Sequence, residues 1–282
     1  MALTIDSHHH FWRYSEAEHG WIGDDMRAIR RDYLPRDLEP ELRATGTRGV
    51  VSVQVRQTLE ETRDLLAFAR EAKFVRGVVG WVPLAAVDVE AHLDRLSGEP
   101  LLRGVRHVVQ GEPDGFLSGE AFGRGVGLLA SRGLVYDVLI YERQLAEAVA
   151  FVDRHPGQVF VLDHIAKPRI RDRALEPWAR EIRRLAERPN VFCKVSGMVT
   201  EADFVSWREE HLRPYWDVVL EAFGPRRLMF GSDWPVCLVA CGYARWHELV
   251  RGWAAGLSDD EQDALFGATA SRAYGLLEED VR

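Results

Sequence analysis

The feature of this chain that most limits its fold is an alternation of short β-branched runs with longer segments of helical period. Eight runs are predicted as strands, over residues 2–7, 49–55, 75–82, 104–110, 134–140, 159–164, 191–197 and 227–232. Helices are predicted between them, at 59–73, 87–97, 119–132, 143–155, 175–188 and 207–223. The helix at 59–73 begins with a predicted capping box formed by Thr58 and Glu61. Such alternation indicates βαβ units, and eight units close most naturally into a single (β/α)₈ TIM barrel.

A doubly wound open sheet is the alternative to the barrel. Its first strand is usually followed by a glycine-rich fingerprint, whereas here His-His-His-Phe-Trp follows at 8–12. No linker or low-complexity tract divides the sequence, so we expect one α/β domain over residues 1–282. The segment 11–48 is long for a strand-to-helix connection, and we expect it to form part of a pocket wall with Trp12, Trp21 and Tyr33.

Charge and hydropathy exclude several classes of protein. The 282 residues include 36 Lys and Arg against 44 Asp and Glu, a net charge of −8, and no basic run exceeds two residues. Nucleic-acid binding and polybasic membrane binding are therefore not expected. No apolar stretch approaches the roughly 20 residues of a spanning helix, and the N-terminus lacks the pattern of a signal peptide. The three cysteines, few and odd in number, indicate reduced thiols in a cytoplasmic protein.

The end of the first strand carries the first candidate site residues. Catalytic groups of a barrel come from the carboxyl ends of its strands. Period two places Asp6, His8 and His10 on one side, which we expect to face the barrel interior. Two imidazoles at i and i+2 lie near enough to share a metal ion or one substrate carbonyl. The alternative is a histidine cluster on the surface.

Two further candidates follow the sixth and eighth strands. His164 comes directly after Leu162-Asp163, and we expect its ring to point into the barrel. Asp233 follows Gly231 where the eighth strand ends, which is a suitable place for a carboxylate that accepts a proton from water. The alternative role for Asp233 is a helix N-cap.

Polar and aromatic residues at other strand ends are candidates for substrate binding. On the second strand we expect Ser52, Gln54 and Arg56 to face inward and Val51, Val53 and Val55 to face outward. Buried Gln and Arg side chains need partners, which a polar ligand or an internal salt bridge would supply. Further candidates are an anchoring arginine, a lysine with a weaker signal, and an aromatic ring suited to the face of a sugar or lactone, namely Arg106, Lys194 and Trp12.

Three motifs together resemble the amidohydrolase superfamily, in particular its "amidohydrolase 2" branch, which contains sugar lactonases of the L-fuconolactonase and L-rhamnonolactonase type. They are Asp-Ser-His-His-His-Phe-Trp at 6–12, Leu-Asp-His-Ile-Ala-Lys-Pro at 162–168 and Phe-Gly-Ser-Asp-Trp-Pro at 230–235. The resemblance extends over nearly the whole chain and implies a distorted (β/α)₈ barrel. It also implies that the enzyme opens a lactone to its hydroxy acid.

The resemblance assigns roles to four residues. His8 and His10 match the family's first-strand histidine pair, His164 its sixth-strand histidine and Asp233 its eighth-strand aspartate. These four would hold one divalent metal ion, with Zn²⁺ as the expected ion, although some lactonases of this branch work without a metal. Asp233 would act as the general base and the histidines would polarise the lactone carbonyl. A two-metal site is not expected, because the bridging residue and the fifth-strand histidine of binuclear members have no match here.

Two other functions remain open at this point. A metal-dependent decarboxylase of an aromatic or unsaturated carboxylic acid would use similar ligands, and its product would be CO₂ rather than a hydroxy acid. A catalytically silent protein would bind a sugar lactone without opening it. The sequence does not decide which lactone is used, whether a metal is required, whether the protein forms a homo-oligomer, or which arginine meets the substrate.

Overall fold

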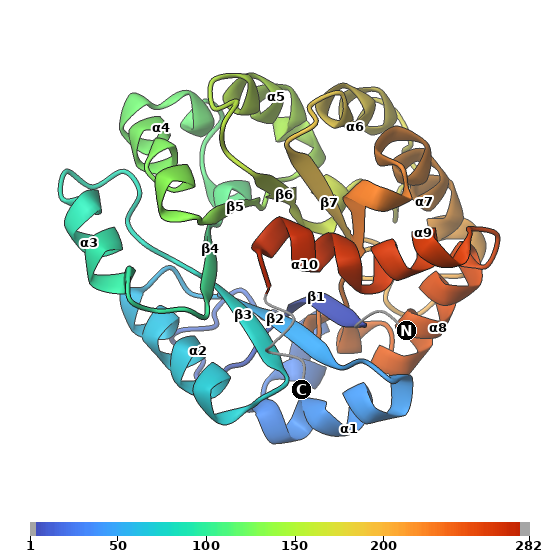
Figure 1. Ribbon diagram of the computed structural model, residues 1–282. Coiled ribbons are helices and arrows are strands. Elements are labelled where there is room, and N and C mark those ends of the chain that lie inside the picture. Colours follow the sequence, from blue (N-terminus) through green and yellow to red (C-terminus); the bar gives the residue numbers. More distant parts are fainter. Residues whose placement is uncertain (1–3, 277–282) are drawn as a thin grey trace.

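Eight parallel strands form one sheet in the computed structural model of the protein, which describes residues 4–276 (Figure 1). The strands are β1 (Ile5–His9), β2 (Gly49–Val53), β3 (Val75–Gly80), β4 (Leu102–His107), β5 (Val135–Val138), β6 (Phe160–Leu162), β7 (Val191–Val195) and β8 (Leu228–Phe230). They pair in sequence order, and a bridge between His9 and Trp234 joins the last strand to the first. The predicted (β/α)₈ barrel is therefore confirmed, with strand ends shifted by a few residues; residues 2–3 of the first predicted strand lie outside the described range.

Helices surround this barrel (Figure 1). They are α1 (Pro35–Thr45), α2 (Leu59–Glu71), α3 (Val89–Leu96), α4 (Glu120–Gly127), α5 (Leu145–Asp153), α6 (Trp178–Ala186), α7 (Glu209–Phe223), α8 (Tyr243–Ala254), α9 (Asp259–Asp263) and α10 (Thr269–Tyr274). The six predicted helices correspond to α2–α7. Helix α1, where Pro40 interrupts the helical pattern, and helices α8–α10 were not predicted. Between residues 4 and 276, no helix is both long and apolar enough to span a bilayer.

Helix α2 begins where it is predicted to begin, but its capping box is only half formed. The Thr58 hydroxyl accepts a hydrogen bond from the Glu61 amide at 3.2 Å. The Glu61 carboxylate does not return to Thr58. It accepts instead from the amides of Val55 at 3.0 Å and Arg56 at 2.5 Å, and so ties the end of β2 to the helix.

The predicted inward orientation of Asp6 is wrong. Its carboxylate accepts hydrogen bonds from the Ser232 amide at 2.8 Å and the Ser232 hydroxyl at 2.6 Å, and it lies beside Tyr243 of the outer helix α8. The register of β1 against β2 shifts between Asp6 and His9, which marks a β-bulge. A bulge breaks the period-two alternation of side chains. His8 can therefore face the interior although Asp6 does not.

The predicted orientation of the second strand is also wrong. Val51 and Val53 belong to one apolar cluster with residues of β1, β3, β5, β6 and β8. A cluster that joins so many strands lies inside the barrel, so these valines face inward. Ser52 faces the other way, where its hydroxyl hydrogen-bonds His9 Nε2 at 2.8 Å.

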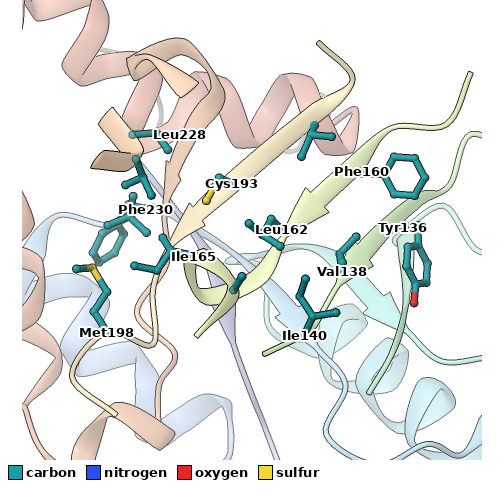
Figure 2. Packing of buried hydrophobic residues seen from close by; sticks show 14 of the residues in the cluster. Tyr136, Val138, Ile140, Phe160, Leu162, Ile165, Cys193, Met198, Leu228 and Phe230 are labelled. Atoms are coloured by element: carbon teal, nitrogen blue, oxygen red, sulfur yellow. The ribbon is translucent and has the colours of Figure 1, made fainter. Parts of the chain in front are cut away.

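The outer face of the barrel packs against the helices. Figure 2 shows its buried residues on β5–β8, which are Tyr136, Val138, Phe160, Leu162, Cys193, Leu228 and Phe230. Helix α10 lies across the end of the barrel where the strands begin (Figure 1), and Ala270, Ala273 and Tyr274 join the interior cluster there. That end is closed by apolar side chains, so the carboxyl ends of the strands form the open mouth.

Candidate active site

A cavity of about 200 Å³ occupies the mouth at the carboxyl ends of the strands. Its polar lining residues are His10, Arg106, Gln110, His164, Lys167 and Asp233. Its apolar lining residues are Trp21, Val55, Val108, Leu139 and Val236. Trp21 comes from the long segment 11–48, as expected from the sequence. Asp233 is the one carboxylate among these lining residues.

The four residues that the sequence singles out converge at the base of this cavity. Asp233 Oδ1 lies 3.4 Å from His10 Nε2, 3.8 Å from His8 Nε2 and 3.9 Å from His164 Nε2. The two first-strand nitrogens, His8 Nε2 and His10 Nε2, are 3.2 Å apart. All four side chains are at least nine-tenths buried. Residues more than 220 positions apart in the chain therefore present their nitrogen and oxygen atoms to one point.

A left-handed stretch of backbone aims His164 at this point. Residues 164–167 all have positive φ, from 47° to 61°. Such conformations are costly for residues with a Cβ, at roughly 1–3 kcal/mol each, and they cluster at functional sites. Gly197 leaves room for the ring, because a Cβ there would lie 2.6 Å from His164 Cγ. This stretch also ends the period-two alternation, so Asp163 and His164 both face the interior.

Asp233 is held by a similar local device. Its φ is 58°, a left-handed value, and its amide donates to the His8 carbonyl at 2.8 Å. Gly231 precedes it, and a Cβ at Gly231 would stand 2.8 Å from His8 Cβ. The strand therefore ends with a glycine that lets His8 approach and a turn that directs the carboxylate into the cavity. An N-cap role for Asp233 is not what the structure shows, since the short helix after it (Val236–Val239) has Pro235 at its cap.

The outer nitrogens of the three rings have protein partners. His10 Nδ1 donates a hydrogen bond to the Val53 carbonyl at 2.7 Å. In a neutral ring with its proton on Nδ1, the other nitrogen, Nε2, carries a free lone pair. His164 Nδ1 pairs with the Ser196 hydroxyl at 2.9 Å, and His8 Nδ1 lies 3.2 Å from Asp163 Oδ1. Partners of this kind fix ring orientation and tautomer in metal-binding histidines.

The donor set suits one tetrahedral cation. Ligand atoms 2.0–2.1 Å from a tetrahedral Zn²⁺ stand about 3.3 Å apart. His10 Nε2 lies 3.2 Å from His8 Nε2 and 3.4 Å from Asp233 Oδ1, and the remaining distance, from His8 Nε2 to Asp233 Oδ1, is 3.8 Å. These three residues form one group able to hold a metal ion, and His8, Asp163 and His164 form another. The residues present therefore fit a divalent metal.

Burial and neighbouring groups set the protonation of the site. Burial lowers the pKa of His164 to about 4 and that of His8 well below its usual range. Burial alone would raise the pKa of Asp233, but the neighbouring His164 and His10 rings outweigh it, and this pKa lies below its ordinary value. Near neutral pH the site therefore combines the neutral imidazoles of His8 and His164 with an ionised Asp233 carboxylate, which is the state needed to bind a cation and accept a proton.

The predicted substrate-binding residues divide into three groups. Arg106 lines the cavity, and its Nη1 donates to Asp163 Oδ2 at 2.9 Å. Arg56 and Trp12 lie around a separate cavity of about 190 Å³, where Arg56 pairs with Glu18. Gln54 and Lys194 are fully buried and are not among the residues that line the active-site cavity.

Gln54 and Lys194 pair with other buried groups of the protein, which is the alternative to their contacting a substrate. Gln54 Nε2 donates to the Arg106 carbonyl at 3.1 Å, and the Gln54 carbonyl accepts from Arg106 Nη2. Lys194 Nζ donates to Asp137 Oδ2 at 2.5 Å and forms an ion pair with Asp163 Oδ1 at 2.9 Å. The buried role of Asp163 was not predicted, because alternation along the strand placed its side chain on the face opposite His164, which was expected to point into the barrel.

Comparison with known proteins shows the family of the chain. The family model described as Amidohydrolase matches residues 5–276. The chain belongs to the amidohydrolase family. An L-fucono-1,5-lactonase from Burkholderia multivorans is 44% identical, with 98% of this chain and 97% of that protein covered. Another from Burkholderia ambifaria is 34% identical over the same shares. A crystal structure of a Burkholderia multivorans amidohydrolase with bound Zn is 44% identical with a TM-score of 0.95, covering 98% of this chain and 100% of that one.

Proposed function

We propose that this amidohydrolase opens a sugar lactone to its hydroxy acid, with L-fucono-1,5-lactone as the first substrate to test. The observation that carries the proposal is the convergence of Asp233 with three imidazoles at the base of the cavity. The family membership and the two lactonase relatives support the same reaction class.

The reaction begins with a water molecule beside Asp233. The ionised carboxylate accepts a proton from this water as it attacks the lactone carbonyl, a role that contributes roughly 10²–10⁴ in rate. Protonated Asp233 then returns the proton to the ring oxygen as the C–O bond breaks. Both transfers use one carboxylate, which agrees with its being the one acid among the residues lining the cavity.

A divalent metal, with Zn²⁺ as the proposed ion, would be held by His8, His10, His164 and Asp233. When bound, it supplies Lewis-acid polarisation of the lactone carbonyl and stabilises the negative charge that develops there. The imidazoles contribute nitrogen donors, and Ser196 and Asp163 orient two of the rings.

The cavity suits a small, hydroxylated ring. Its volume of about 200 Å³ lies below the roughly 300–1,000 Å³ typical of drug-sized ligands. Buried polar atoms are nearly always hydrogen-bonded, yet Arg106 Nε and Gln110 Oε1 have no partner among the described residues. We propose that they bind hydroxyl or carboxyl groups of the substrate. The arginine and Lys167 also supply positive charge for the carboxylate product.

An indicator assay of acid release from a panel of L- and D-sugar lactones tests this function. We expect turnover of L-fucono-1,5-lactone, reduced by a chelator and restored by added Zn²⁺, with metal content measured alongside. Carboxylic acids that could lose CO₂ form the control panel. CO₂ release from them without acid release from any lactone would contradict the proposal, as would lactone binding without turnover.

We further propose that the protein works in the cytoplasm on this small-molecule substrate. The three cysteines, Cys193, Cys237 and Cys241, are buried and form no disulfide, which suits a reducing compartment. Size-exclusion chromatography with light scattering will show whether the chain forms a homo-oligomer.

A further inference from the structure

A continuous series of buried polar groups connects helix α10 to the active site through the barrel. The Tyr274 hydroxyl lies 2.8 Å from Asp137 Oδ2, which is 2.5 Å from Lys194 Nζ. The same ammonium lies 2.9 Å from Asp163 Oδ1, which in turn lies 3.2 Å from His8 Nδ1. All five side chains are at least 98% buried, and none lines the active-site cavity.

His8 Nδ1 has two neighbours that demand opposite roles of it. Asp163 Oδ1 and Lys194 Nζ each lie 3.2 Å from this nitrogen. An ionised carboxylate only accepts hydrogen bonds and an ammonium only donates them. If Nδ1 carries the proton, it pairs with Asp163 and repels Lys194. If it accepts from Lys194, the proton of a neutral ring moves to Nε2.

The site requires the first of these tautomers. His8 Nε2 faces His10 Nε2 at 3.2 Å and Asp233 Oδ1 at 3.8 Å. A proton on His8 Nε2 would occupy the space that the substrate carbonyl or a cation must share with these atoms. Arg106 Nη1, which can only donate, lies 3.5 Å from the same nitrogen and also favours a lone pair there.

We propose that Asp137 and Tyr274 are positioning residues of the active site. Asp137, held by Tyr274, draws the hydrogen bonding of the Lys194 ammonium to itself, so that His8 Nδ1 donates to Asp163 rather than accepting from Lys194. The carboxylate of Asp137 attracts the ammonium at 2.5 Å, a shorter distance than the 3.2 Å from the ammonium to His8 Nδ1. The Tyr274 hydroxyl, reaching in from α10, fixes the carboxylate in place. The expected loss of activity rests on the proposed function, whereas the expected change in the His8 tautomer does not.

The test compares the His8 tautomer and the kinetics in four variants of the full chain. Spectra of ¹⁵N-histidine-labelled protein, recorded after chelation so that no metal ion occupies Nε2, distinguish a protonated Nδ1 from a protonated Nε2, and the His8 signals are assigned by their absence in His8→Gln. The variants are Asp137→Asn, Asp137→Asn with Lys194→Met, Tyr274→Phe, and Tyr215→Phe as the matched control. Tyr215 is a buried tyrosine of α7 whose hydroxyl has no partner among the described residues.

We expect Asp137→Asn to move the His8 proton from Nδ1 to Nε2, because the released ammonium donates to Nδ1. Its kcat on L-fucono-1,5-lactone should fall about 10–100-fold, the usual effect of losing an outer partner of a ligand histidine, with little change in KM. Removing Lys194 as well should restore the Nδ1–H tautomer. Tyr274→Phe should shift the tautomer in the same direction by a smaller amount, and Tyr215→Phe should match the unmodified chain.

An unchanged tautomer in Asp137→Asn, or no restoration in the double variant, would overturn the inference. If Asp137→Asn does not fold, the comparison of Tyr274→Phe with Tyr215→Phe decides, and identical His8 spectra would overturn it. If the unmodified chain opens no lactone, the proposed function fails while the spectra still decide the positioning role.

Discussion

The substitution Asp233→Asn tests the central carboxylate with little disturbance of the backbone. Asparagine has almost the same volume as aspartate and tolerates the left-handed φ of 58° at this position. The hydrogen bond from its amide to the His8 carbonyl is also kept. What is lost is a basic oxygen within 3.9 Å of three imidazole nitrogens.

The expected loss of rate follows from the absence of a substitute base. Loss of a general base costs roughly 10²–10⁴ in rate. No second carboxylate is among the residues that line the cavity, so the upper half of that range applies. We therefore expect kcat to fall about 10³–10⁴-fold, which corresponds to about 4–5.5 kcal/mol of transition-state stabilisation.

The assay is lactone opening followed with a pH indicator, at matched protein concentration and with circular dichroism to verify the fold. Metal content is measured in each preparation, because the carboxylate is also a proposed metal ligand. Asp260→Asn, on the exposed first turn of α9, serves as the control and should retain full activity. If Asp233→Asn keeps more than a tenth of the unmodified kcat, Asp233 is not the base.

Three further predictions concern residues around the site and the helices. Ser196→Ala should weaken metal affinity or activity by about 10–100-fold, since it removes the partner of His164 Nδ1; chelator competition measures this. Gly197→Ala should destabilise the fold by at least about 1–3 kcal/mol in urea unfolding, because φ is +64° and the new Cβ meets the His164 ring. Burial lowers the pKa of His247 from 6.5 to about 4. Between these pH values His247 is protonated in the unfolded chain and neutral in the folded one, so the stability of the fold decreases as pH drops from 6.5 through 4. His247→Phe should remove up to about 3 kcal/mol of that fall, and unfolding curves at pH 7 and 4.5 that move in parallel for both proteins would contradict it.

The architecture could be predicted because its signals are local. Strands of a parallel barrel are buried on both faces and read as short β-branched runs, and all eight such runs became strands. The convergence of the four candidate residues could be predicted because strand ends in a barrel meet at one mouth. His8, His10, His164 and Asp233 stand at those ends, and the structure brings them together.

Side-chain direction could not be predicted in the same way. When both faces of a strand are buried, period two separates two sets of residues without saying which set faces inward, and β2 was assigned the wrong way for this reason. In β1 a bulge changes the alternation between Asp6 and His9. After β6 a left-handed stretch does so at His164. A bulge or a left-handed turn depends on contacts with distant residues, such as Gly197, which the local sequence does not contain.

The polar residues inside the barrel also show why residue type alone does not identify a substrate contact. Asp137, Asp163, Arg106 and Lys194 carry two negative and two positive charges, and their mutual pairing makes their burial tolerable. A side chain whose polar atoms are all paired in this way has nothing left to offer a substrate, as with Lys194. Arg106 differs, because its Nε has no partner and it lines the cavity. The unpaired atom, rather than the charge, is therefore what distinguishes Arg106 from Lys194 as the proposed substrate contact.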